Sequence, residues 1–364
     1  MIVDNHGLPE RSLPPASRAG GAAPAGGCPV TGERTVVGLV LPPGDDRPPG
    51  LEPAEDLAEL RVVRTPSELV ARAADAEVLL VWEFRENVLE PVWSELEGSL
   101  RWIHAASAGV DAIVFPGLAR SGVVVTNSRG VLDEAIAEWV LAVLLAFAKD
   151  LPGTLELQRQ RRWAHRETER LAGRRVLVVG AGSVGRAVAR LCRAVGMTVE
   201  GIARTPRAGD GDFDRVGGPA DLPDRLAATD VVVVCAPLTP DTRGLLGRAE
   251  LDALRPGAWL VNVGRGPVVD EGALLAALGS GHVARAALDV FAEEPLAADH
   301  PLWTTGGVVV SAHMAGDFVG WQEAFSALFV DNLGRWRRGE ALRNVVDVAA
   351  AAAGGGPSRG RGRP

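Results

Sequence analysis

Three polar side chains follow apolar runs in the second half of the chain, and together they could bind a carboxylate and protonate a carbonyl oxygen. Arg265 follows AWLVNVG, Glu294 lies in LDVFAEEPL, and His313 ends GVVVSAH. A guanidinium offers a planar fork to a carboxylate, and an imidazole can donate a proton to a carbonyl oxygen near neutral pH. A carboxylate beside the imidazole would fix its tautomer and keep it protonated. Taken singly, the arginine and the histidine could also be ordinary structural residues.

A glycine-rich turn precedes these residues and favours the catalytic interpretation. GAGSVG (180–185) follows the apolar run RRVLVVG and leads into a helix-like segment, and this context predicts a dinucleotide-binding unit. Gly180 permits a tight turn, Gly182 lets the backbone approach the pyrophosphate, and Gly185 lets the helix pack closely on the strand. The phosphates are then expected at the N-terminus of the helix.

The stretch GIARTPR, which follows the turn, indicates which dinucleotide binds. An NAD site usually has an acid at the end of this strand, and this chain has Ala203 there. Arg204, Thr205 and Arg207 could instead bind a 2′-phosphate. Glu200 is an alternative acceptor for the ribose, but it comes before the end of the strand, where we expect it to point into a layer. We therefore predict NADP(H) rather than NAD(H).

Short apolar runs separated by helix-like segments predict two parallel sheets covered by helices. The first group is TVVGLVL (35–41), LRVVRT (60–65), EVLLVW (77–82), LRWIHAA (100–106) and GVVVTN (122–127). The second is RRVLVVG (174–180), MTVEGIA (197–203), DVVVVCAP (230–237), AWLVNVG (258–264), AALDVF (286–291) and GVVVSAH (307–313). A long apolar helix over 133–151 should be buried between layers or domains. An amphipathic helix over 321–340 is expected to return to the first domain.

The predicted fold class is α/β, with two Rossmann-like domains that have parallel sheets. The cofactor domain, residues 129–315, is expected to be inserted into a discontinuous substrate domain, residues 34–128 and 316–348. Residues 1–33 and 349–364 are rich in Gly, Pro and Ala, and we expect a disordered leader and a disordered tail there.

The composition limits the classes of protein that the chain can belong to. The chain has 364 residues, of which 47% are hydrophobic, and a formal net charge of −8. These values are typical of a globular protein with two ordinary domains, and they argue against a nucleic-acid partner or an acidic membrane. Cys28, Cys192 and Cys235 are too scattered for a disulfide framework or a zinc site. Since no apolar run could span a membrane and the N-terminus lacks a signal-peptide core, we expect a cytoplasmic enzyme without a metal.

Several motifs resemble those of the D-isomer-specific 2-hydroxyacid dehydrogenase family, across about residues 35–348. They are VGAGSVGRAVAR, APLTPDTRGLL (236–246), LVNVGRGPVVDEGALLAAL (260–278), ARAALDVFAEEPL (284–296), HPLW (300–303), VVVSAHMAG (308–316), ASAGVD (106–111) and VVVTNSRGV (123–131). The resemblance implies that Arg265, Glu294 and His313 are the catalytic residues and that Asp289 holds the nicotinamide amide. It also implies a homodimer joined through the cofactor domain. Ala312 is a departure, because proline commonly precedes the histidine in this family.

The residues and the resemblance together define a predicted site and activity. The predicted cofactor-binding residues are Gly180, Gly182, Ser183, Val184, Gly185, Arg204, Thr205, Arg207, Cys235, Ala236, Pro237, Val263 and Asp289. The predicted substrate-binding residues are Ser107, Ala108, Gly109 and Trp82, the last with a core position as its alternative. The activity implied is hydride transfer between NAD(P)H and a 2-oxo acid such as glyoxylate or hydroxypyruvate. The alternative is a dehydrogenase-like transcriptional corepressor that senses the nucleotide.

Overall fold

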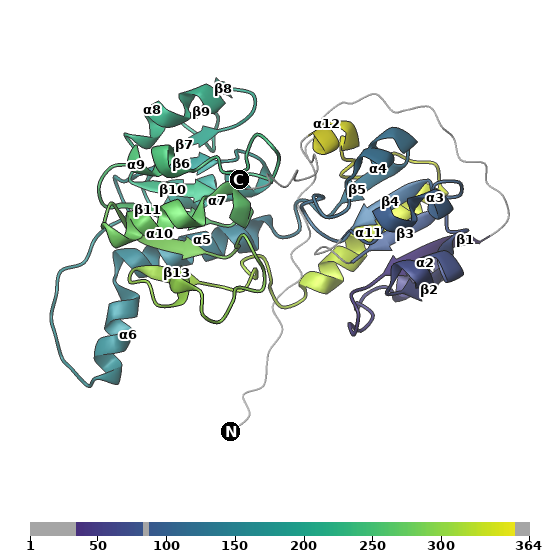
Figure 1. The fold of residues 1–364 in the computed structure, drawn as a ribbon, viewed down its shortest axis with the longest axis horizontal. Helices are drawn as coiled ribbons and strands as arrows, with labels where there is room; N and C mark the ends of the chain where they lie inside the picture. The colour runs from purple at the N-terminus through teal and green to yellow at the C-terminus, as the bar shows by residue number, and fades with distance from the viewer. Residues whose placement is uncertain (1–33, 83–86, 354–364) are drawn as a thin grey trace, which may run out of the picture.

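The computed structural model describes residues 34–82 and 87–353, which form two parallel sheets covered by helices (Figure 1). The predicted leader, 1–33, and residues 354–364 of the predicted tail lie outside the described residues. The first sheet contains β1 (Thr35–Val40), β2 (Ala58–Val63), β3 (Val78–Val81), β4 (Trp102–Ala105) and β5 (Val124–Asn127). Its order is β2-β1-β3-β4-β5, and all of its pairings are parallel. Each strand overlaps one of the predicted runs.

Short helices cover the first sheet. They are α1 (Glu52–Leu57), α2 (Pro66–Ala73), η1 (Glu90–Val92), α3 (Trp93–Leu96) and α4 (Pro116–Ser121). Because helices lie on both faces, the central strands β3 and β4 are buried along their whole length, as is usual for parallel sheets. Their carboxyl ends lead directly into the loops that carry predicted site residues.

The second sheet is larger. It contains β6 (Arg175–Val179), β7 (Thr198–Ile202), β8 (Arg207–Ala208), β9 (Arg215–Gly217), β10 (Val231–Val234), β11 (Ala258–Asn262), β12 (Val283–Leu288) and β13 (Val308–Val310). The order is β13-β12-β11-β10-β6-β7-β9-β8, so the direction of winding changes between β6 and β10. Open α/β sheets bind ligands at this kind of switch point. The antiparallel hairpin β8–β9 was not predicted, because its strands are short and polar.

The two faces of the second sheet bury separate apolar clusters. The helices around it are α5 (Asp133–Ala148), α7 (Ser183–Ala194), η2 (Pro219–Asp221), α8 (Leu222–Leu226), α9 (Arg248–Asp252), η3 (Gly266–Val268), α10 (Glu271–Gly279) and η4 (Pro301–Trp303). Along β6, Val176 and Val178 join the cluster of α5 and α7, whereas Leu177 and Val179 join that of α8, α9 and α10. This division follows from the two-residue period of a strand.

The long helix predicted over 133–151 is α5, which ends three residues early, and a second helix follows it. α5 ends at Ala148, and Asp150 takes a left-handed conformation with φ 47°. The Asp150 side chain then accepts a hydrogen bond from Gly153 at the start of α6 (Leu151–Arg159). α5 packs against α7 in the second domain, and α6 projects away from the body of the protein (Figure 1).

The helix predicted over 321–340 returns to the first sheet, as expected. α11 (Trp321–Arg337) lies beside that sheet (Figure 1), and Phe329 stacks on Trp102 with 5.6 Å between the ring centroids. The second sheet is therefore inserted into the chain that builds the first. α12 (Val348–Ala353) corrects the predicted boundary of the tail, because an alanine-rich segment has a high helix propensity. No helix in the described ranges is long and apolar enough to cross a membrane.

Candidate active site

The glycine-rich turn between β6 and α7 is crowded on one side and open on the other. Gly180 has φ 106°, and a Cβ there would lie 2.5 Å from the backbone nitrogen of Ala236. A Cβ on Gly185 would lie 2.1 Å from the carbonyl oxygen of Gly180, so a side chain would push α7 away. No atom lies within 4 Å of the Cβ position of Gly182 among the described residues. The open side fits a pyrophosphate at the N-terminus of α7.

The loops that follow neighbouring strands meet at this turn. A Cβ on Gly264, after β11, would lie 2.6 Å from the carbonyl oxygen of Ala236, after β10. The structure therefore brings the turn together with the loop residues predicted to contact a cofactor, namely Cys235, Ala236, Pro237 and Val263. All of them lie at the carboxyl edge of the second sheet, beside the switch point.

The two arginines after β7, Arg204 and Arg207, differ in their contacts with the rest of the protein. Arg204 is exposed and has no hydrogen bond or ion pair with other residues of the described ranges. The Nη2 of Arg207 donates to the carbonyl oxygen of Ala181 in the glycine-rich turn at 3.3 Å. The Nε of Arg207 lies 3.6 Å from Oδ2 of Asp210. Arg207 is thus already held beside the turn, whereas Arg204 is available to a ligand.

Asp210 stays ionised beside Arg207. Burial raises the pKa of Asp210, but hydrogen bonds from the N–H groups of Phe213 and Asp212 and the nearby Arg186 guanidinium lower it to about 2. The positive charge of Arg207 is therefore partly balanced by a carboxylate of the same domain.

Glu200 lies on the other face of the sheet. Its Oε2 accepts a hydrogen bond from Nη1 of Arg225 on α8 at 2.6 Å. The next residue, Gly201, faces the turn instead, because its Cβ would lie 3.2 Å from that of Ala181. The expectation that Glu200 points into a layer is confirmed, since alternate residues of a strand face opposite sides.

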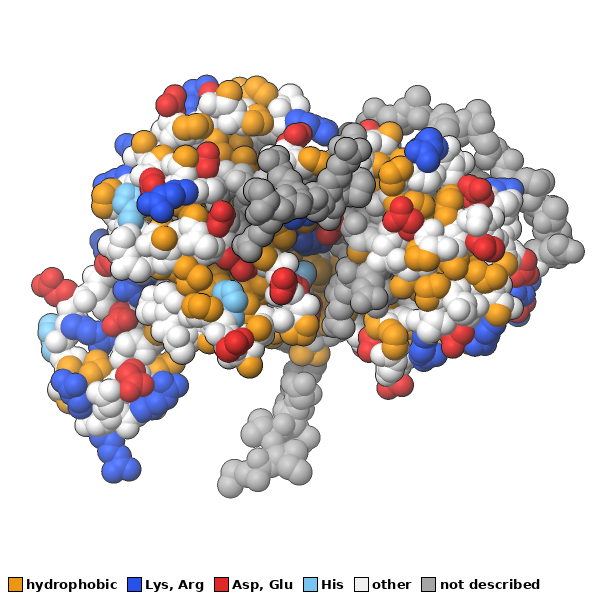
Figure 2. Space-filling view, in the orientation of Figure 1, with side chains coloured by type: hydrophobic (Ala, Val, Ile, Leu, Met, Phe, Trp, Pro, Cys, Tyr) orange, Lys and Arg blue, Asp and Glu red, His pale blue; other side chains and the backbone are white. Residues whose placement is uncertain are grey.

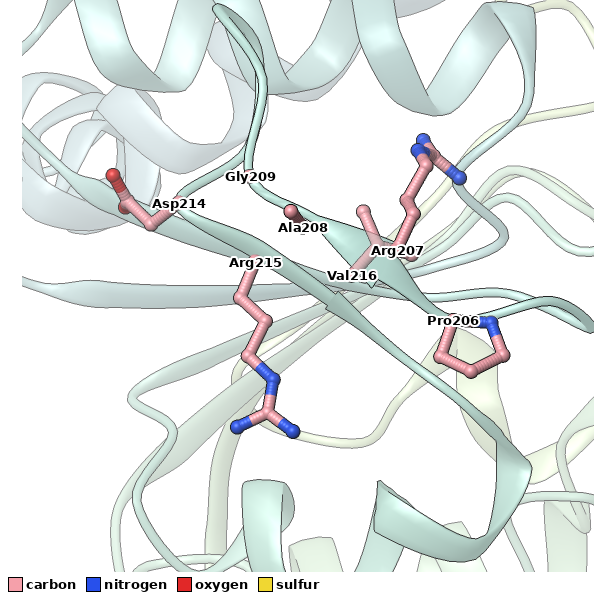
Figure 3. Close-up of a pocket in the computed structure, with 7 residues that line it drawn as sticks. All are labelled: Pro206, Arg207, Ala208, Gly209, Asp214, Arg215 and Val216. Carbon is pink, nitrogen blue, oxygen red and sulfur yellow. The ribbon is translucent and has the colours of Figure 1, made fainter.

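A pocket of about 450 Å³ lies beside the β8–β9 hairpin. It is lined by Pro206, Arg207, Ala208, Gly209, Asp214, Arg215 and Val216 (Figure 3). The side chains of Arg207 and Arg215 extend to opposite sides of the hairpin (Figure 3), as the pairing of Arg207 with Val216 requires. Only Arg207 therefore lies on the side of the glycine-rich turn.

His313 and Glu294 form a hydrogen-bonded pair at the same carboxyl edge. Nδ1 of His313 lies 2.7 Å from Oε2 of Glu294, and Oε1 of Glu294 accepts from the N–H of Phe291 at 2.9 Å. Burial raises the pKa of Glu294, but the hydrogen bonds from His313 and Phe291 and the charge of Arg265 outweigh burial, so the pKa is lowered. The structure thus brings the three predicted catalytic residues together.

The backbone of His313 is held by Asp289. His313 has φ 53°, a left-handed conformation that is costly for a residue other than glycine and often occurs at functional sites. The carboxylate of Asp289 accepts hydrogen bonds from Oγ of Ser311 and from the N–H groups of Met314 and Ala315, at 2.5, 2.9 and 2.9 Å. Sequence reasoning missed this structural role. A contact of Asp289 with a nicotinamide amide stays a prediction.

Arg265 reaches across to the first domain. Its Nε lies 3.2 and 3.1 Å from the carboxylate oxygens of Asp111, and its Nη2 lies 3.0 Å from Oδ1. Its Nη1 donates to the carbonyl oxygen of Gly264 at 2.8 Å. Asp111 was not predicted as a site residue, although ASAGVD was among the motifs noted.

The predicted substrate loop faces this guanidinium. A Cβ on Gly109 would lie 2.0 Å from Nη2 of Arg265. The carbonyl oxygen of Ala108 accepts from Asn127 at 2.6 Å, and that of Ser107 from the N–H of Ser128 at 2.9 Å. No bond within the described part of the chain uses the backbone N–H groups of residues 107–109. These groups remain available to an anion.

Trp82 lies in the core instead of at this loop. It is 3% exposed, and its ring is 6.3 Å from that of Trp321 and 6.0 Å from that of Phe325 on α11. This is the core position given as the alternative, because the returning helix α11 covers this side of the sheet. A contact of Trp82 with a substrate stays a prediction. His104 on β4 is also fully buried, which lowers its pKa to about 3, and its Nδ1 lies 2.7 Å from Oγ1 of Thr126.

Comparisons with known proteins agree with this fold. The family model "D-isomer specific 2-hydroxyacid dehydrogenase, NAD binding domain" matches residues 141–315. A glyoxylate reductase of Aeropyrum pernix is 34% identical over 259 residues, which are 68% of this chain and 76% of that protein. A D-3-phosphoglycerate dehydrogenase of Archaeoglobus fulgidus is 30% identical over 80% of this chain, but the chain spans only 55% of its length.

A solved structure is similar over nearly its whole length. It is an NADPH-dependent glyoxylate/hydroxypyruvate reductase of Sinorhizobium meliloti in complex with NADP and malonate. The TM-score is 0.75 and the identity 31%, over 86% of this chain and 97% of that one.

The fold and its glycine-rich turn define a two-domain α/β protein of the nucleotide-binding, Rossmann-like class. Within that class, the chain belongs to the D-isomer specific 2-hydroxyacid dehydrogenase family. The family consists of NAD(P)-dependent oxidoreductases, and the similar proteins include glyoxylate/hydroxypyruvate reductases. These findings support the dehydrogenase prediction over the corepressor alternative.

Proposed function

We propose that this chain reduces 2-oxo acids to D-2-hydroxy acids with NAD(P)H, with glyoxylate and hydroxypyruvate as the leading substrates. The observation that carries the proposal is the His313–Glu294 pair, 2.7 Å apart. It lies at the same sheet edge as the open glycine-rich turn and as Arg265. An acid, a carboxylate-binding cation and a dinucleotide turn at one place are the parts that such a reaction needs.

The substrate is held by its carboxylate. Arg265 has an N–H group on each of Nη1 and Nη2 beyond those that bond to Gly264 and Asp111. These groups and the free backbone N–H groups of residues 107–109 bind the carboxylate and the carbonyl oxygen, which fixes the orientation of the reacting carbon.

His313 supplies the proton. Its Nδ1 is engaged by Glu294, so Nε2 is the nitrogen that faces the substrate. The cofactor, when bound, supplies the hydride to the carbonyl carbon. The imidazolium of His313 gives its Nε2 proton to the carbonyl oxygen and becomes neutral, while ionised Glu294 stabilises the imidazolium beforehand.

We propose NADP(H) as the preferred cofactor. Support comes from the absence of an acid at Ala203, from the pairing of Glu200 with Arg225 on the other face, and from the exposed Arg204 beside Arg207. A 2′-phosphate needs a cation, whereas a 2′-hydroxyl needs an acceptor such as a carboxylate. The complex of the similar Sinorhizobium meliloti protein with NADP is consistent with this preference.

We also propose that the chain forms a cytoplasmic homodimer joined through the second domain. Leu151 and Leu155 on α6 are 48% and 51% exposed, and Trp163 after it is fully exposed. The projecting part that carries them has hydrophobic side chains among charged ones (Figures 1 and 2). Large apolar side chains gathered on a projecting segment are typical of an interaction surface.

A substrate screen with both cofactors tests the proposed activity. Purified protein is mixed with NADPH or NADH and with glyoxylate, hydroxypyruvate, pyruvate or a bulkier 2-oxo acid, and the loss of absorbance at the nicotinamide band is followed. We expect consumption with small 2-oxo acids and a higher kcat/KM with NADPH. Failure to consume any of them, with NADPH binding intact, would overturn the proposal and favour a nucleotide-sensing role.

A further inference from the structure

Asp111 and Arg265 connect the two domains at the site. Asp111 lies in the loop after β4 of the first sheet, and Arg265 lies in the turn after β11 of the second. The contacts between them join residues that are 154 positions apart in the chain. Their side chains are 36% and 27% exposed. An ion pair this accessible to solvent adds little to stability. Its main effect is therefore on the orientation of the Arg265 guanidinium.

The ion pair fixes which side of the guanidinium is free. Asp111 occupies the edge made by Nε and Nη2, and Gly264 takes a proton of Nη1. The N–H groups that remain are one on Nη1 and one on Nη2, which together match the two oxygens of a carboxylate. Without Asp111, the side chain could rotate about its own bonds and offer either edge.

Gly109 makes this approach possible. Its Cβ position lies 2.0 Å from Nη2 of Arg265 and 2.7 Å from Oδ1 of Asp111. A side chain at position 109 would displace the guanidinium and break the ion pair. The loop is thus shaped to bring Asp111 and Arg265 together, beside the unused backbone N–H groups of residues 107–109.

We infer that Asp111 is a positioning residue, which holds Arg265 of the second domain so that its free Nη1/Nη2 edge binds the carboxylate of the 2-oxo acid. This inference rests on the proposed function. Asp111 does not touch the reacting atoms. It acts through Arg265, and it makes the binding of substrate depend on the contact between the two domains.

A double-mutant cycle tests this role. Asp111→Asn keeps the size of the side chain and removes its charge, and it is compared with Arg265→Met and with the double variant, using NADPH and glyoxylate. Asp56→Asn, which removes an exposed carboxylate of the first domain, is the matched control. Binding of NADPH without substrate, followed by its fluorescence, checks that each variant is folded.

We expect Asp111→Asn to raise the KM for glyoxylate by about tenfold or more, with a smaller change in kcat. In the Arg265→Met background, Asp111→Asn should have no further effect, because a residue that acts through another loses its effect when the other is gone. A KM within about twofold of the wild-type value, or a full additive effect in the double variant, would overturn the inference. A lower KM would also overturn it, since Asp111 would then compete with the substrate. An inactive wild-type protein would instead contradict the proposed function.

Discussion

Nδ1 of His313 lies 2.7 Å from Oε2 of Glu294, and the two residues come from loops after neighbouring strands, β12 and β13. The loop of Glu294 is also tied to that of Arg265. A Cβ on Gly266 would lie 1.9 Å from the backbone carbon of Phe291, and Glu294 itself accepts from the N–H of Phe291. The acid, its carboxylate partner and the anion-binding arginine are therefore held by one set of packed turns.

Replacing His313 should remove the proton donor and leave the fold intact. We expect His313→Ala to lower kcat for glyoxylate by about 10²–10⁴-fold, with little change in NADPH binding. His313→Gly should give the same loss and a higher Tm, because glycine adopts φ 53° without strain. Steady-state rates and thermal unfolding check both results. Near-normal turnover in either variant would remove His313 from the mechanism.

Glu294→Gln should change the pH dependence of reduction. The lowered pKa of Glu294 means that its carboxylate is ionised at neutral pH. The ionised Glu294 carboxylate therefore contributes to stability above the ordinary carboxyl pKa. This contribution is lost as the pH falls through the lowered pKa of Glu294. Glutamine can still accept from Phe291 but cannot stabilise an imidazolium, so the alkaline limb of kcat/KM should move to lower pH. An unchanged pH profile would show that Glu294 does not act on His313.

Arg204 should control the choice of cofactor. It is exposed and unpartnered within the described residues, whereas Arg207 is engaged by Ala181 and Asp210. We expect Arg204→Asp to reduce the ratio of kcat/KM with NADPH to that with NADH by about tenfold or more. Arg207→Ala should have a smaller effect. Arg215→Ala, on the opposite side of the same hairpin (Figure 3), is the control, and a ratio that stays constant in Arg204→Asp would contradict the proposed phosphate site.

Asp133 at the start of α5 is expected to destabilise the protein at neutral pH. It is 8% exposed, and its Oδ1 has no hydrogen-bond partner in the described part of the chain. Burial raises its pKa, and contacts with Ser183 and the backbone of Gly130 offset this only in part. Because the pKa of Asp133 is raised in the folded state, protonated Asp133 contributes to stability below the ordinary carboxyl pKa. This contribution is lost as the pH rises through the raised pKa of Asp133.

Asp133→Asn should therefore raise the free energy of unfolding near neutral pH by about 1–3 kcal/mol. The gain should shrink as the pH is lowered, because Asp133 is then protonated in the wild-type protein. Thermal unfolding across a pH series measures this, and Asp56→Asn controls for the loss of one charge. A gain that is equal at all pH values would contradict the explanation.

The oligomeric state should depend on the segment around α6. If the proposed dimer buries Leu155 and Trp163, then Leu155→Asp and Trp163→Asp should each shift the protein towards the monomer, because a buried unpaired charge is costly. Light scattering coupled to gel filtration measures the mass. Val319→Asp changes a fully exposed apolar residue elsewhere and should leave the mass unchanged. A dimer that persists in both α6 variants would place the interface on another surface.

Local pattern made the elements and the reacting residues predictable. The runs rich in valine form the buried strands, and GAGSVG forms the turn. Both could be predicted because the periodicity of apolar side chains and the backbone freedom of glycine are properties of a few neighbouring residues. His313, Glu294 and Arg265 could be found because residues at the carboxyl ends of parallel strands meet at one edge. The break at Asp150 was missed although its signal is local, since Asp150 caps Gly153 and a proline follows it at the start of α6. The β8–β9 hairpin was missed because its strands are short and polar.

The sequence by itself determined the two-sheet architecture, the position of the dinucleotide turn and the identity of the three chemical groups. Only the tertiary structure decided that Trp82 is a core residue beneath α11. It also decided that Glu200 forms an ion pair with Arg225 and that Arg207 donates a hydrogen bond to Ala181. It alone paired Asp111 with Arg265 across the domains. The physical reason is that a side chain's partners depend on the packing of distant segments, whereas its chemistry and local conformation are properties of the residue and its neighbours.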